Sequence, residues 1–127
     1  MYRFIVADMR TWVQQGLSDL ILHIYPSATI RTVPTASDLL ADYARYGADL
    51  ILMCYNLPRV DAQRVLVTLR NAGNPVPVAV FAADPIDITA AIRWGATSAL
   101  DNPFDAANLR GLLGDLLSPY AAEQIFG

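Results

Sequence analysis

The most informative ten residues of the chain are Asp49-Leu50-Ile51-Leu52-Met53-Cys54-Tyr55-Asn56-Leu57-Pro58. Every position from 50 to 55 is apolar or aromatic. A strand with one face in water alternates apolar and polar residues, whereas a parallel strand covered on both faces is apolar throughout. Proline then ends the extended run, because it cannot continue the strand's hydrogen-bond ladder. We therefore expect a central parallel strand over residues 50–55.

On both sides of this stretch, extended apolar runs alternate with helical patterns. We expect further strands over 2–7, 29–33, 76–82 and 97–100. The run over 29–33 is the most polar, which favours a position at the sheet edge. Apolar residues at helical spacing follow each strand, in the sets Val13, Leu17, Leu20, Ile21, Ile24; Leu39, Leu40, Tyr43; Val60, Val65, Leu66, Leu69; 86–94; and Phe104, Leu109, Leu112, Leu113, Leu116, Leu117. Five such βα units predict a doubly wound α/β fold with helices on both faces of the sheet.

The local signals at the helix ends agree with this reading. Thr35, with Asp38 three residues on, is a variant of the capping box, and Gly47 is a typical helix end. Asp84 followed by Pro85 predicts an N-cap and a first-turn proline for the helix over 86–94.

The length and composition of the chain limit the classes of function that it can have. The 127 residues suit one domain, for which we predict a folded unit over 1–118 and a tail or linker start over 119–127. Net charge is −3, and the nine basic residues, all arginine, are scattered, which argues against a nucleic-acid surface. No apolar run reaches the roughly 20 residues of a membrane span, and the N-terminus lacks a secretory signal. We therefore expect a cytoplasmic protein that does not bind membranes.

In open parallel sheets, binding sites form outside the carboxyl ends of the strands. The residues in that position are 8–9, 54–58, 82–84 and 101–104. They include a single cysteine, Cys54, which allows neither an internal disulfide nor a zinc cluster. They offer no nucleophile–base pair and no glycine-rich phosphate loop, so we expect no enzymatic activity and no cofactor.

These strand ends carry a family resemblance. Val6-Ala7-Asp8, the stretch over 49–58, the stretch over 76–83 and Asn102-Pro103-Phe104 resemble, in order and spacing, the receiver (CheY-like) domains of bacterial response regulators. The resemblance spans essentially the whole chain. It implies a flavodoxin-like five-stranded sheet in the order 2-1-3-4-5 and a role in two-component signal transduction.

The same resemblance points to a degenerate phosphorylation pocket. In the family, two adjacent acids bind Mg²⁺, an aspartate accepts phosphate, and a hydroxyl residue and a lysine contact the phosphoryl group. At the matching positions this chain has Asp8 and Met9, then Cys54, then Ala82 and Asn102. Mg²⁺ requires several hard oxygen ligands, and a thiol does not replace a carboxylate. We therefore expect no metal site and no phosphorylation.

The resemblance also implies where partners bind. Receivers use the fourth helix, fifth strand and fifth helix for output or dimerisation. That region of this chain holds Ile88, Ile92, Arg93, Trp94, Thr97, Asp101, Leu109 and Leu113, some of which must be core. The leading prediction is a phosphorylation-independent interaction module of atypical receiver type, binding a protein partner or forming a homodimer.

Three alternatives stay open. The first is that the chain is the N-terminal regulatory half of a DNA-binding transcription factor, with a linker from Pro119. The second is that the vacated pocket binds a small molecule. The third is that Cys54 senses thiol oxidation. For that cysteine a packed core role is the simpler reading.

Other residues carry simpler expectations. Asp8 either caps a helix or pairs with Arg10, and the Asn102–Pro103 bond is expected to be cis. His23 is expected at the surface or the helix end. Trp12 and Trp94 are either core residues or members of an exposed contact patch.

Overall fold

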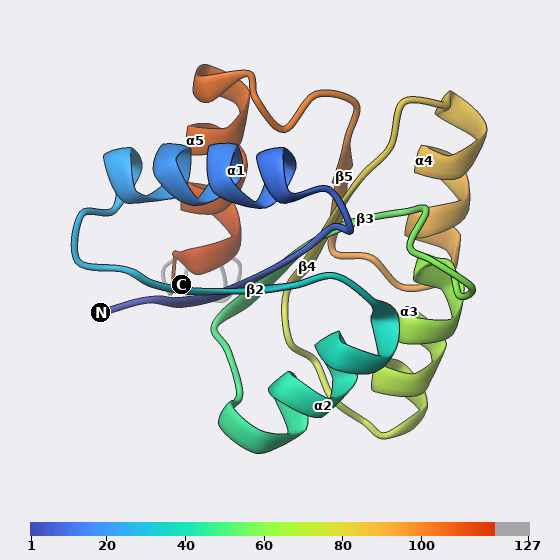
Figure 1. Cartoon of the computed structure of the whole chain (residues 1–127). Helices are drawn as coiled ribbons and strands as arrows, with labels where there is room; N and C mark the ends of the chain where they lie inside the picture. Colours follow the sequence, from blue (N-terminus) through green and yellow to red (C-terminus); the bar gives the residue numbers. More distant parts are fainter. Residues whose placement is uncertain (119–127) are drawn as a thin grey trace, which may run out of the picture.

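A computed structural model describes residues 1–118 (Figure 1). The predicted tail over 119–127 lies outside the described residues. Five parallel strands form one sheet in the order β2-β1-β3-β4-β5, which confirms the predicted fold and strand order. Their bounds are β1 Arg3–Ala7, β2 Thr29–Val33, β3 Leu50–Cys54, β4 Val78–Phe81 and β5 Ser98–Leu100.

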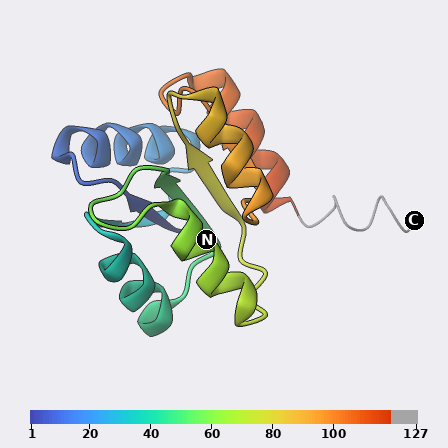
Figure 2. The ribbon, with the colours of Figure 1, turned by 90° about the vertical axis from the view of Figure 1, so that its right-hand side faces the viewer.

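Five helices alternate with the strands and cover both faces of the sheet (Figures 1 and 2). They are α1 Thr11–Ile24, α2 Ala36–Tyr46, α3 Ala62–Asn71, α4 Pro85–Arg93 and α5 Ala106–Leu117. α1 and α5 pack on one face, and α2, α3 and α4 pack on the other. Within residues 1–118, every helix is too short or too polar to cross a membrane.

The continuous apolar pattern of β3 results from this double cover. Leu50 and Leu52 point toward α1 and α5, whereas Ile51 and Met53 point toward the opposite cluster with α2 and α3. All four side chains are fully buried. β2 is partly exposed along its length, as predicted for an edge strand.

Local signals predicted in the sequence set the helix ends. The Thr35 hydroxyl accepts a hydrogen bond from the Asp38 N–H at 3.0 Å, and Asp84 accepts one from the Ile86 N–H at 2.8 Å. α2 ends at Gly47, whose φ of 70° lies in the region that favours glycine.

Three expectations about loops are wrong. Val60 precedes α3 and Phe104 precedes α5, because Asp61 and Asp105 cap those helices one residue before they begin. The bond before Pro103 is trans, as are all peptide bonds within residues 1–118. Trans is the lower-energy form by about 0.5–1 kcal/mol, and Asn102 closes the turn in that form by accepting the Phe104 N–H at 3.0 Å.

Candidate functional site

A pocket of about 470 Å³ opens at the carboxyl ends of β1, β3, β4 and β5. All five residues predicted from the sequence line it, namely Asp8, Met9, Cys54, Ala82 and Asn102. The parallel order of the strands explains this convergence, since each residue stands shortly after, or at the last position of, one of four strands, and Asp8 and Met9 both follow β1.

Asp8 is the buried anion of the pocket, with 1% of its surface exposed. Arg10 binds both of its carboxylate oxygens. The Arg10 backbone N–H and Nε–H donate to Oδ1 at 2.8 and 3.0 Å, and Nη2–H donates to Oδ2 at 2.8 Å. The side-chain hydrogen bonding to Asp8 is the main cause that raises the pKa of the Arg10 guanidinium, whereas burial acts to lower that pKa. The expectation that Asp8 pairs with Arg10 is confirmed.

Two aromatic side chains form the rim of the pocket. The Arg10 guanidinium lies 5.4 Å from the centre of the Trp12 ring, and Trp12 stacks on Phe104 with centroids 5.9 Å apart and planes 14° apart. Phe104 in turn lies against Gly16 of α1, where an added Cβ would come within 2.8 Å of the ring. Trp12 is thus an exposed contact residue and Phe104 a half-exposed one. Only the small residue at position 16, one turn after Trp12, hinted at this stack in the sequence.

Cys54 lies at the end of β3 and is partly buried. Burial is the main cause that raises the pKa of its thiol. The thiolate is the reactive form, so a raised pKa makes the thiol less reactive at neutral pH. This disfavours the thiol-sensor alternative.

The sequence matches no protein-family model. It also matches no curated protein. The structure, by contrast, resembles many solved structures.

Three of these similar structures are as follows. NtrX from Brucella abortus matches with a TM-score of 0.84 at 19% identity, over 98% of this chain and 28% of that one. A putative response regulator from Chloroflexus aurantiacus matches with a TM-score of 0.83 at 17% identity, over 91% of this chain and 97% of that one. A response regulator receiver domain protein from Clostridium thermocellum matches with 0.83 at 14%, over all of both chains. The chain has the fold of receiver domains. It spans little more than a quarter of the length of NtrX.

The metal that the receiver resemblance implies does not fit this pocket. Mg²⁺ requires near-octahedral oxygen ligation, usually from one or two free carboxylates together with water and substrate oxygens. Here the carboxylate of Asp8 is engaged by an arginine, and its neighbour Met9 is an exposed thioether that offers no hard oxygen. Asp101, on the pocket lining, is solvent-exposed. Within residues 1–118, no three His, Cys, Asp or Glu side chains group as metal ligands.

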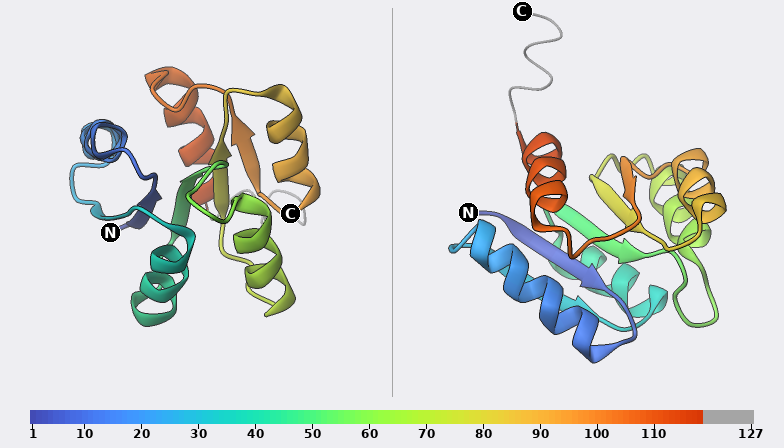
Figure 3. Two further views of the ribbon diagram at one scale, coloured as in Figure 1. Left: turned by 45° about the vertical axis from the view of Figure 1, so that its right-hand side comes forward. Right: turned by 90° about the horizontal axis from the view of Figure 1, so that it is seen from above.

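The residues predicted for partner binding are only partly exposed. β5 lies between α4 and α5 at the sheet edge (Figure 3, left). The predicted members Ile92, Arg93, Trp94, Thr97 and Asp101 are exposed, and Ile88 is half-buried. Leu109 and Leu113 are fully buried, so they do not belong to an exposed face. The reason is their helical spacing, which turns both side chains from α5 toward the sheet.

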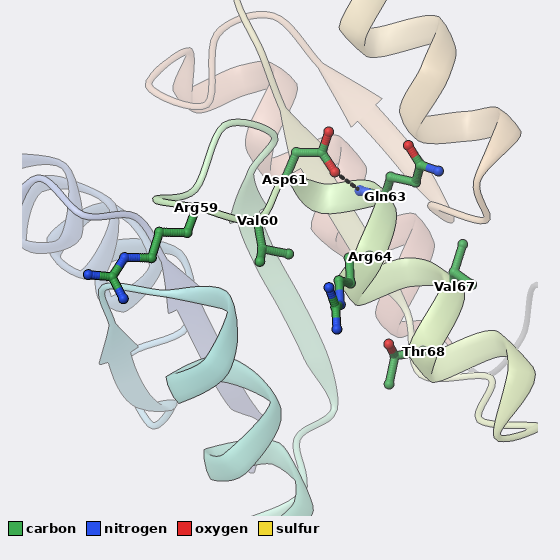
Figure 4. Close-up of a pocket in the computed structure, with 7 residues that line it drawn as sticks. All are labelled: Arg59, Val60, Asp61, Gln63, Arg64, Val67 and Thr68. Atoms are coloured by element: carbon green, nitrogen blue, oxygen red, sulfur yellow. Dashed lines mark hydrogen bonds between the residues drawn. The ribbon is translucent and has the colours of Figure 1, made fainter.

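A second hollow, of about 520 Å³, runs along α3 and the loop before it (Figure 4). Its lining comes from the single stretch 59–68. Asp61 is occupied as the N-cap of α3, accepting the Gln63 N–H at 3.1 Å, and the Arg59 side chain points away from the helix. No polar groups from separate elements converge there, so we do not regard it as a functional site.

Proposed function

We propose that the chain is a non-enzymatic signalling module that acts by binding a protein partner or a second copy of itself, without being phosphorylated. The observation that carries the proposal is the state of the Asp8 carboxylate. Both of its oxygens are bound by Arg10, so the Asp8 carboxylate is already occupied.

Charge explains why phosphorylation is disfavoured. A phosphoryl group brings a charge of about −1.5 to −2, and catalysis of its transfer depends on cations placed around it. Among the residues that the structure describes, Arg10 is the only basic one that lines the pocket, and its charge is already balanced by Asp8. The acceptor position holds Cys54 and the lysine position holds Asn102.

Intact-mass spectrometry tests this directly. The purified chain is incubated with acetyl phosphate and Mg²⁺, beside a receiver domain that retains its aspartate as the positive control. We expect no phosphate adduct on this chain. An adduct of one phosphate would contradict the proposal.

Partner binding is proposed for the exposed part of α4 and β5. Ile92 and Trp94 expose apolar surface there, beside the exposed Arg93 in the chain. Apolar and aromatic residues within a polar surround are typical of interface centres. If the partner is a second copy, sedimentation should detect dimers that increase with concentration. Ile92→Asp should then abolish them, while Ile86→Asp, a change at the more exposed isoleucine at the other end of α4, should not.

A second candidate is that the chain is the regulatory part of a longer DNA-binding regulator. The match to 28% of NtrX favours it, because there a receiver fold forms one part of a longer chain. The length of the native gene product discriminates between this candidate and a stand-alone adaptor.

A further inference from the structure

We propose that Arg10 is a built-in cation that takes the place of a divalent metal on Asp8, so that any metal ion must first displace the guanidinium. This inference rests on the proposed function and adds a second, independent cause for the loss of metal binding. The first cause is the missing acid at Met9, and the second is the arginine.

The geometry of the pair is that of a fully engaged carboxylate. Nε–H and Nη2–H of Arg10 donate to different oxygens of Asp8, which is the two-pronged arrangement that makes arginine–carboxylate bonds strong and directional. The Arg10 backbone N–H adds a third hydrogen bond, at 2.8 Å. With only 1% of Asp8 exposed, water has no open approach to it.

The guanidinium is also held by its other contacts. It lies over the Trp12 ring, which is itself stacked on Phe104. Cation–π contact of this kind favours an arginine in place. The loop between Asp8 and Arg10 is fixed as well, because Gln14 of α1 donates to the Asp8 carbonyl at 2.6 Å. Arg10 is therefore positioned by the fold and does not depend on Asp8 alone.

Electrostatics then opposes a metal ion. The Asp8–Arg10 pair is neutral as a unit, so it attracts a divalent cation weakly. A metal placed on Asp8 with Arg10 still present would put two cations on one carboxylate, and unit charges a few Å apart repel strongly in a partly buried site. Restoring the missing acids should therefore not be enough to restore metal binding.

The experiment rebuilds the acids with and without the arginine. The background Met9→Asp/Cys54→Asp supplies the two carboxylates that the receiver resemblance implies. Arg10→Met is added to it, because methionine keeps an apolar stem against Trp12 and removes the charge. Mn²⁺ binding is followed by the loss of the free-ion signal in electron paramagnetic resonance. Arg64→Met, an exposed change outside the pocket lining, controls for net charge.

We expect Arg10→Met to tighten Mn²⁺ binding by about tenfold or more and Arg64→Met to leave it unchanged. Equal affinity with and without Arg10 would overturn the inference. The proposed function would survive that result, since it is tested by phosphate mass on the unaltered chain.

A measurement on the unaltered chain covers the case in which the rebuilt variants do not fold. The Arg10 Nε–H resonance in a ¹⁵N spectrum should be protected from exchange and unmoved by millimolar Mg²⁺. A shift of the Asp8 amide signal on adding Mg²⁺, with the Arg10 Nε–H signal unmoved, would show that metal binds without displacing the arginine, contrary to the inference.

Discussion

Replacing Arg10 with alanine tests the physical basis of the pocket. The change removes both side-chain hydrogen bonds to Asp8 and leaves only the backbone N–H at 2.8 Å. A hydrogen bond to a charged group contributes about 1.5–3 kcal/mol, and removing one partner of a fully buried ion pair costs about 3–5 kcal/mol. The Arg10 side chain is 48% exposed, so water can reach the truncated site and reduce the cost. We expect a loss of about 2 kcal/mol in the free energy of unfolding.

The chain offers a matched control. Arg3 is also 48% exposed, but its partner Asp49 is 37% exposed and 3.7 Å away. Arg3→Ala should cost less than about 1 kcal/mol, since exposed ion pairs contribute little. Urea unfolding of both variants at neutral pH gives the comparison. In the background Asp8→Asn, Arg10→Ala should cost much less than in the native chain. If Arg10→Ala and Arg3→Ala lowered the free energy of unfolding equally, the Asp8–Arg10 pair would not be the stabilising interaction at this site. The same would follow if the effect of Arg10→Ala did not depend on Asp8.

Three further predictions concern other parts of the fold. Cys54 should react slowly with a thiol reagent in the folded chain, faster as pH rises and after unfolding, because burial raises its pKa; rapid reaction of the folded chain at neutral pH would contradict this. Leu113→Ala should lower the free energy of urea unfolding by about 3 kcal/mol, whereas Ile92→Ala should change it by less than about 0.5 kcal/mol; similar values would argue against the core assignment. Gly95→Ala should lower it by about 1 kcal/mol or more, because φ is 112° and a Cβ would lie 2.9 Å from Cγ of Arg70; an unchanged midpoint would contradict this.

The order and burial of the strands could be predicted from the sequence because the signals are strong and local. Six apolar or aromatic positions from Leu50 to Tyr55 leave little alternative to a strand covered on both faces. Thr35 and Asp84 marked helix starts for the same reason, since a cap requires a specific side chain at a specific position. The pocket residues converge because parallel strands bring their carboxyl ends to one edge.

What the sequence did not predict depends on long-range packing. Phe104 was predicted to lie in the same helix as Leu109 and Leu113, yet it lies before α5 and packs on Trp12 and Gly16. The periodicity of apolar residues cannot distinguish an apolar residue in the first turn of a helix from an apolar residue in the loop before it. The burial of Leu109 and Leu113 follows from the rotation of α5 on the sheet, and the sequence left open which of its apolar residues face inward.

The pocket of this chain should not bind magnesium and a phosphoryl group together. The most direct test of this prediction is a ¹H–¹⁵N spectrum of the unaltered chain with Mg²⁺ and beryllofluoride, a stable mimic of the phosphoryl group. We predict no change in the amide signals of Asp8, Met9, Cys54 and Asn102. Saturable shifts at these amides that require both additives would contradict the account.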